Sequence, residues 1–169
     1  MKSMDLAALR ERVATLAGAA SGRRGVLPFG AAALDRALPG GGLALGALHE
    51  VCGLGGDEED GAVAAAFLAG LLARLAPARP VLWCLAGDDL YGPGLAACGL
   101  SPRRLLRVRA RARDDRTVLE AMEDGLRVPA LAAVVGEVGT LPLTASPGSG
   151  ARCGGRSCCA AAAASPRSG

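Results

Sequence analysis

The chain has 169 residues, a length that suits one domain burying about two-thirds of its unfolded surface. Apolar residues make up 51% of the sequence and aromatic residues only 2%, so the core has to be built from Ala, Leu and Val. The net charge of +3 does not by itself indicate nucleic-acid binding. No charge-free apolar run reaches about 18 residues, and the N-terminus lacks the apolar centre of a signal peptide, so we expect a cytoplasmic protein without a membrane span.

The N-terminal half begins with apolar residues at helical spacing, which predict a short amphipathic helix over residues 4–18. A connection rich in Gly and Arg follows, and residues 1–25 are therefore assigned to a helix and linker. A short helix is predicted over residues 32–38, before a triple glycine that can supply turns with positive φ. The first core strand is predicted over residues 47–52, and a long alanine–leucine helix over residues 62–75.

The second half continues the alternation of strands and helices. Residues 80–85 form an apolar run typical of a buried parallel strand, and residues 90–98 form a helix with Gly99 at its C-terminal cap position. A strand, an amphipathic helix and a further buried strand are predicted over residues 104–110, 117–127 and 130–138. This order predicts an α/β fold with a mostly parallel sheet flanked by helices.

A glycine turn, a strand, a glycine-rich loop and a helix follow one another after Leu38, the layout of a phosphate-binding P-loop. The residues that would hold a phosphate are missing. Gly53 and Gly61 stand eight positions apart instead of five, and Ala62 and Val63 occupy the places of Lys and Ser/Thr. Four carboxylates between the glycines would repel a triphosphate. We therefore expect a degenerate loop without ATPase activity and without a cofactor, ATP with Mg²⁺ being the alternative; its glycines are Gly53, Gly55, Gly56 and Gly61.

Residues 29–53 resemble the segment that leads into the core domain of RecA-type recombinases. The LHE step in that segment, together with residues 81–84, 89–106 and 134–138, resembles the ImuA family, RecA-like proteins of bacterial damage-induced mutagenesis. The resemblance covers about residues 5–146. It implies a RecA-like P-loop NTPase fold and a non-catalytic accessory protein of error-prone translesion DNA synthesis in the SOS response.

The same resemblance implies ImuB and/or RecA as partners, with an error-prone DnaE-type polymerase engaged indirectly. Two other functions stay open: a RecA-paralogue ATPase that binds DNA, and a cell-division inhibitor of the SulA type. The ATPase would require Lys and Ser/Thr after Gly61, which this chain lacks. The division inhibitor would bind a tubulin-like GTPase.

Glu137 stands where RecA-like ATPases carry their Walker B acid. Because the upstream Lys and Ser/Thr are missing, a structural or vestigial role is favoured over metal binding. Asp88 and Asp89 lie roughly where RecA proteins place the carboxylate that activates water, but such a pair is equally an ordinary turn or helix cap. His49 is expected to be hydrogen-bonded at a strand end, and no metal site is predicted.

Arginines form the densest charged feature of the chain. Arg107, Arg109 and Arg111 share one face of a strand, and such a face can contact phosphate groups. No aromatic residue is interleaved, so base stacking is absent, and acidic residues just beyond could pair with the arginines. A protein-interaction or solvated face is favoured and DNA is the alternative, the residues being Arg103, Arg104, Arg107, Arg109 and Arg111.

Residues 147–169 contain only Pro, Gly, Ser, Ala, Arg and Cys, without periodicity. Nothing there can bury enough surface to offset the entropy of ordering, so the tail is predicted to be disordered. In sequences of the resembling family an arginine-rich helix and the rest of the core follow at this point. The tail therefore indicates a frameshifted or truncated reading, with a genuine flexible tail as the alternative, and the predicted core of residues 26–146 is incomplete.

Overall fold

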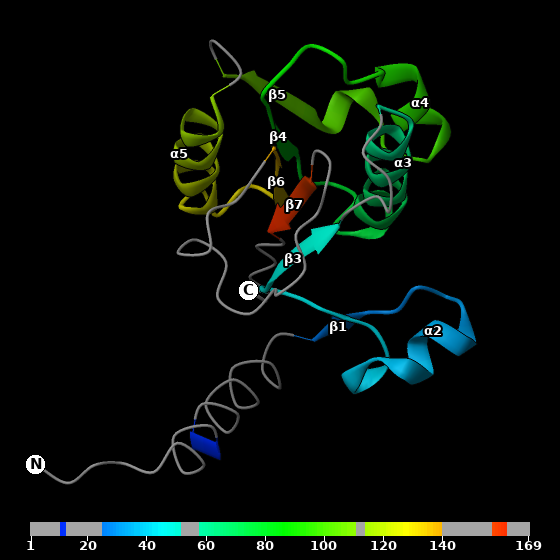
Figure 1. Cartoon of the computed structure of the whole chain (residues 1–169). Helices are drawn as coiled ribbons and strands as arrows, with labels where there is room; N and C mark the ends of the chain where they lie inside the picture. The colour runs from blue at the N-terminus through cyan, green and yellow to red at the C-terminus, as the bar shows by residue number, and fades with distance from the viewer. Residues whose placement is uncertain (1–10, 13–24, 52–57, 111–113, 140–156, 162–169) are drawn as a thin grey trace, which may run out of the picture. The chain divides into compact units, whose positions relative to one another are not determined.

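The computed structural model describes residues 11–12, 25–51, 58–110, 114–139 and 157–161 (Figure 1). The chain divides into two compact units, and the main division falls between Ala47 and Leu48. It does not fall after residue 25, where the sequence analysis ends the N-terminal segment. Of the helix predicted over residues 4–18, residues 11–12 are described and are helical, and the other residues lie outside the described part of the chain.

The first unit is a small antiparallel ribbon with two helical turns. Strand β1 (Val26–Leu27) pairs with β2 (Leu43–Ala44), and α2 (Ala32–Ala37) and the 3-10 turn η1 (Pro39–Gly41) connect them. The predicted helix over residues 32–38 is thus confirmed. Gly40 and Gly41 have φ of 77° and 81°, a conformation that residues with a Cβ rarely adopt. At Gly42 a Cβ would lie 2.6 Å from the Leu27 carbonyl oxygen, so this turn requires glycine.

The second unit is built on a five-stranded sheet in the order β3-β7-β6-β4-β5. Strand β4 pairs in parallel with both β5 and β6, so three strands form a parallel sheet. The strands predicted over residues 47–52, 80–85, 104–110 and 130–138 are all present. Their bounds are Leu48–Val51 for β3, Val81–Leu85 for β4, Leu105–Arg109 for β5, Ala133–Val138 for β6 and Ser157–Ala161 for β7.

Strand β7 comes from the low-complexity tail, where the sequence predicts disorder. It lies between β3 and β6 and pairs antiparallel with both. The sheet is therefore mixed, where the sequence predicts a mostly parallel one. The pairing is understandable because ladder hydrogen bonds come from the backbone, so this position in the sheet demands no large side chain. The remaining tail residues, 147–156 and 162–169, lie outside the described part of the chain.

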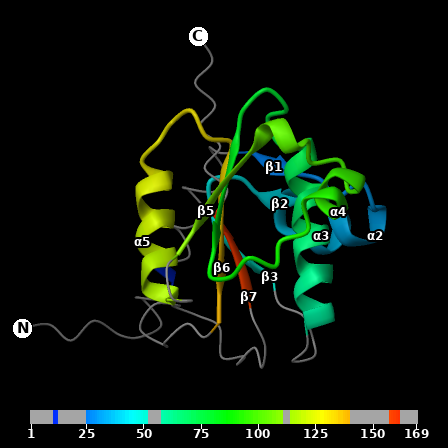
Figure 2. The ribbon, with the colours of Figure 1, turned by 90° about the horizontal axis from the view of Figure 1, so that it is seen from above.

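Helices cover both faces of this sheet, α5 on one side and α3 with α4 on the other (Figure 2). Each corresponds to a predicted helix, and α3 begins four residues before the predicted start. None of the helices in the described residues has the length and apolar character needed to cross a membrane. The bounds are Glu58–Arg74 for α3, Gly92–Ala97 for α4, Asp115–Leu126 for α5 and Pro102–Arg104 for the 3-10 turn η2.

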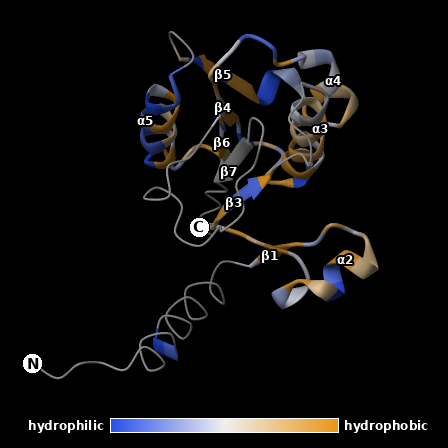
Figure 3. Ribbon diagram, viewed as in Figure 1, coloured by the Kyte–Doolittle hydropathy of each residue, from blue (hydrophilic) through white to orange (hydrophobic). Residues whose placement is uncertain are grey.

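The core of the second unit lies between these layers. Trp83, Val134 and Val135 are fully buried in the central strands. Val118 and Met122 from α5, whose apolar side faces the sheet (Figure 3), belong to the same buried cluster as Val134. Leu126, predicted on the same stripe, remains 43% exposed. The sheet accommodates α5 through Gly136, where a Cβ would overlap the Met122 side chain. A small residue in the sheet thus lets the helix pack closely, in a core that has few aromatic side chains.

Candidate functional site

Glu137 lies in β6 and is 9% exposed. Its Oε1 accepts a hydrogen bond of 2.8 Å from the indole Nε1 of Trp83 in β4. Because Trp83 pairs in register with Val135, two residues before Glu137, both side chains point to the same face of the sheet. A buried carboxylate is costly unless it is hydrogen-bonded, and the indole N–H can only donate. The position predicted for a Walker B acid is therefore engaged inside the core.

Sequence reasoning did not connect Trp83 with this carboxylate. A signal was present, since the single tryptophan of the chain lies in a predicted buried strand, and a buried indole N–H usually requires an acceptor. Which acceptor it finds depends on the order of β4 and β6 in the sheet, and a sequence does not show that order.

The predicted glycine loop is described only at its end. Gly61 lies inside α3, not in a loop, and a Cβ there would meet nothing within 4 Å. Gly53, Gly55 and Gly56 lie outside the described residues. Ala62 and Val63, which occupy the places of Lys and Ser/Thr, are exposed on the same helix.

Polar side chains gather at the edge where the parallel strands β4, β5 and β6 end. Asp88 follows β4, and its Oδ2 lies 2.9 Å from NH1 of Arg109 at the end of β5. These side chains are 74% and 61% exposed, so the pair contributes only about 0–1 kcal/mol. The Asp115 carboxylate accepts from the backbone N–H of Gly139, at 3.0 and 3.1 Å. Within the described ranges, no group of three or more His, Cys, Asp or Glu side chains could hold a metal.

The other two predicted site residues have ordinary positions. Asp89 is exposed in the turn after β4, and His49 is half-buried in β3. Cys84, in β4, is fully buried. Burial raises the pKa of its thiol to about 11, so the thiol is protonated at neutral pH and is not a nucleophile.

Arg104, which the sequence predicts to be part of a DNA or partner surface, instead makes hydrogen bonds within the fold. Its guanidinium is half-buried and donates to backbone carbonyls at the C-terminal end of α3 and in the loop that follows. A cation at a helix C-terminus also interacts favourably with the helix dipole. Arg104 is thus an internal cap, with hydrogen bonds to the carbonyl oxygens of Leu72 (3.3 Å), Ala73 (3.4 Å), Leu75 (2.7 Å), Ala76 (3.2 Å) and Arg79 (2.9 Å).

Three of the other predicted arginines remain on the surface. Arg103 in η2 and Arg107 and Arg109 in β5 are exposed. Arg111 lies outside the described residues. The structure therefore keeps a basic surface along β5, without Arg104.

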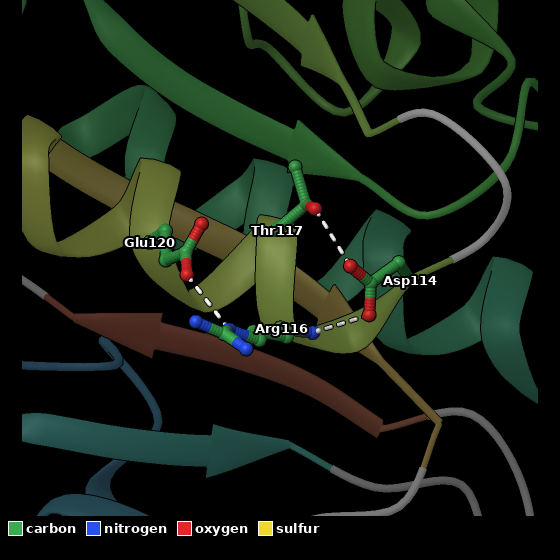
Figure 4. A network of polar contacts seen from close by, with 4 residues as sticks. All are labelled: Asp114, Arg116, Thr117 and Glu120. Carbon is green, nitrogen blue, oxygen red and sulfur yellow. Dashed lines mark hydrogen bonds and ion pairs between the residues drawn. The ribbon is translucent and has the colours of Figure 1, made fainter.

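The acidic residues beyond β5 pair within α5 itself. Asp114 caps the helix: its carboxylate accepts from the Thr117 hydroxyl (2.7 Å) and from the Arg116 backbone N–H (3.1 Å) (Figure 4). These hydrogen bonds, that of Thr117 first, lower the pKa of Asp114. Arg116 forms an ion pair with Glu120 at 2.9 Å, and Arg127 pairs with Glu123 and Asp124 in the last turn. Among these contacts, none neutralises Arg107.

Taken together, these features define a layered α/β protein in which three neighbouring strands are parallel and a carboxylate is buried near the end of β6. Two curated relatives, both called Protein ImuA and from the Caulobacter vibrioides strains NA1000 / CB15N and ATCC 19089 / CIP 103742 / CB 15, are each 42% identical to it over 122 residues. This match covers 71% of the chain and supports its identification as an ImuA protein. The chain spans about half the length of these relatives, 49%. No family model and no solved structure matches.

Proposed function

We propose that this chain is an accessory protein of damage-induced mutagenesis, with a RecA-like core that does not hydrolyse ATP. Its similarity to ImuA proteins supports a role in damage-induced mutagenesis. Its resemblance to that family supports action in error-prone translesion synthesis during the SOS response. The expected partners are ImuB and/or RecA, with a DnaE-type polymerase reached indirectly, and the expected compartment is the cytoplasm.

The observation that carries the non-catalytic role is the hydrogen bond between Trp83 and Glu137. In RecA-like ATPases the corresponding acid acts on the nucleotide through magnesium and its water. Here the carboxylate is buried and accepts from an indole, so it has a structural task that is independent of any nucleotide. The sequence offers neither the Lys nor the Ser/Thr that a P-loop uses, since Ala62 and Val63 stand there.

The ATPase alternative is tested directly by replacing Glu137 with Gln. The amide oxygen of glutamine can still accept from the Trp83 indole, so the proposal expects the variant to fold and to retain its function. In an ATPase, loss of this carboxylate would reduce phosphate release by about 100-fold or more. Glu123→Gln, an exposed change on α5, serves as the matched control.

Two readouts decide between the alternatives. The first is DNA-stimulated phosphate release by the purified chain, together with the fluorescence of Trp83 during titration with ATP and Mg²⁺. The proposal expects neither phosphate release nor a spectral change. Phosphate release that Glu137→Gln abolishes would establish an ATPase and refute the non-catalytic role.

The second readout is the frequency of damage-induced mutation in a bacterium whose own ImuA gene has been deleted. The wild-type chain and Glu137→Gln should restore mutagenesis equally. Restoration by the wild type alone, with the variant folded, would contradict the proposal. Filamentation of the cells with no gain in mutagenesis would instead indicate a division inhibitor, and co-purification from the same cells tests ImuB and RecA as partners.

A further inference from the structure

Strand β5 is at one edge of the five-stranded sheet, next to β4. Its pairing with β4 runs from Leu105, opposite Val81, to Arg109, opposite Leu85. Within the described residues no strand pairs with the opposite side of β5. Such an edge is a template for another strand unless the fold covers or blunts it.

The outward-facing backbone groups of β5 can be assigned. The N–H of Ala110, just after the strand, donates to the Leu85 carbonyl of β4 at 2.8 Å. In a β-strand the backbone groups of successive residues point alternately to the two neighbouring strands. Val108 and Leu106 therefore face β4, as Ala110 does, whereas the N–H and C=O groups of Arg107 and Arg109 face outward.

The side chains of β5 alternate in the orthogonal direction. Leu106 and Val108 are in register with Leu82 and Cys84, which belong to the face packed against α5. They are nevertheless 48% and 42% exposed, so α5 covers β4 and β6 more completely than it covers β5. Arg107, in register with Trp83, is exposed on the other face. The edge thus presents apolar side chains on one face and arginines on the other.

The charge of this edge selects its occupant. In a second copy pairing antiparallel about Arg107, that arginine would lie opposite itself, and like charges directly opposite each other destabilise a strand pair. Single-stranded DNA would use aromatic side chains for stacking, and β5 has none. An extended peptide can form hydrogen bonds with the outward-facing backbone groups of β5, and its carboxylates can form ion pairs with the arginines.

We propose that β5 is a docking edge for an extended, acidic segment of a partner protein, which adds to the sheet as an outer strand beside Arg107 and Arg109. Carboxylates of the segment lie on the arginine face, and its alternate apolar residues extend the surface of Leu106 and Val108. Peptides that add to a sheet edge gain affinity from main-chain hydrogen bonds and specificity from alternate side chains. This inference names the partner's chemistry and rests on the proposed function only in taking the partner to be a protein.

The experiment measures amide hydrogen exchange in the whole chain, with and without a capped nine-residue peptide of alternating Glu and Val. At saturation the amides of Arg107 and Arg109 are expected to become at least about tenfold more protected, because both would enter a new ladder. The amides of Leu106 and Val108, which already face β4, should change little. The same peptide N-methylated at every residue has no N–H to donate to the ladder and should not protect any of them.

Variants separate the charge from the backbone. Arg107→Glu is expected to weaken peptide binding about tenfold, whereas Arg36→Glu, an equal charge change on α2 in the other unit, should leave it unchanged. Arg107→Pro removes the outward N–H but none that faces β4, so an edge strand should tolerate it and lose binding. Fluorescence of the buried Trp83 reports whether each variant is folded.

Several outcomes would overturn the inference. These are no protection of the Arg107 and Arg109 amides at saturation, equal binding of a peptide with Lys in place of Glu, or full binding by folded Arg107→Glu. Displacement of the peptide by a twenty-nucleotide thymidine strand that binds more tightly would show a DNA surface, and protection of the same amides by raising the chain concentration alone would show self-association. Because the probe is synthetic and nucleotide-free, failure here leaves the ATP and mutagenesis tests of the proposed function unaffected.

Discussion

Replacing Arg104 with alanine should destabilise the chain by about 3 kcal/mol, although the residue lies in a stretch that the sequence marks as a surface. Its guanidinium donates to the carbonyl oxygens of Leu75 and Arg79 at 2.7 and 2.9 Å. Each hydrogen bond from a charged donor contributes about 1.5 kcal/mol or more. The three longer contacts, with the carbonyl oxygens of Leu72 and Ala73 in α3 and of Ala76 in the following loop, are counted as nothing. Arg104→Lys keeps the charge but not the planar fork, so it should recover only about 1 kcal/mol.

Urea unfolding followed by Trp83 fluorescence measures this loss, because the chain has one tryptophan and it is buried. Arg103→Ala is the matched control: its side chain is exposed, and such changes usually stay within about 0.5 kcal/mol. A loss below about 1 kcal/mol for Arg104→Ala, or full recovery by Arg104→Lys, would refute the role of the guanidinium as a multiple carbonyl cap.

Three further predictions concern packing and titration. Gly136→Ala should lower the free energy of unfolding by about 1–3 kcal/mol, because its Cβ would lie 2.8 Å from Met122 Cγ. Gly61→Ala, in open space on α3, should raise the free energy of unfolding by about 0.5–1 kcal/mol. Urea unfolding measures both changes. Because the buried Cys84 thiol stays protonated while the unfolded thiol ionises, the stability of the wild type should fall as pH rises from 9.0 to about 11, and Cys84→Ala should lack that part of the fall. Asp114→Ala should lower the Tm at pH 7, and the difference from wild type should disappear as pH falls below 3.8 and through the lowered pKa of Asp114; equal differences at pH 7 and pH 2 would contradict it.

The sequence predicts the local elements well because their signals are local. Strand β4 is an apolar run ended by carboxylates, and α3 is a long alanine–leucine segment, so periodicity and composition are sufficient. The glycine turn before β2 could also be predicted from the sequence, because a run of glycines indicates a turn with positive φ angles. The prediction of disorder is wrong for residues 157–161, which form β7. A low-complexity segment has no pattern of apolar side chains that would indicate a strand, but its backbone can still pair with β3 on one side and β6 on the other.

The candidate site was predicted less completely, because the role of each of its side chains depends on contacts with residues that are distant in the sequence. Glu137 is recognisable as an acid at the end of a buried strand, but its hydrogen bond comes from a residue 54 positions earlier. Arg104 and Arg107 read alike in the sequence. The structure turns one toward the carbonyls of α3 and leaves the other on an exposed edge.

By itself the sequence determined the alternation of strands and helices, the small-residue core and the absence of the Lys and Ser/Thr of a P-loop, because these depend only on residue type and spacing. The tertiary structure alone decided the order of the strands, and with it which carboxylate meets the indole, which arginine becomes a cap and which strand is left at the edge. Strand order is set by packing and pairing between distant segments, whose free energies no local pattern records.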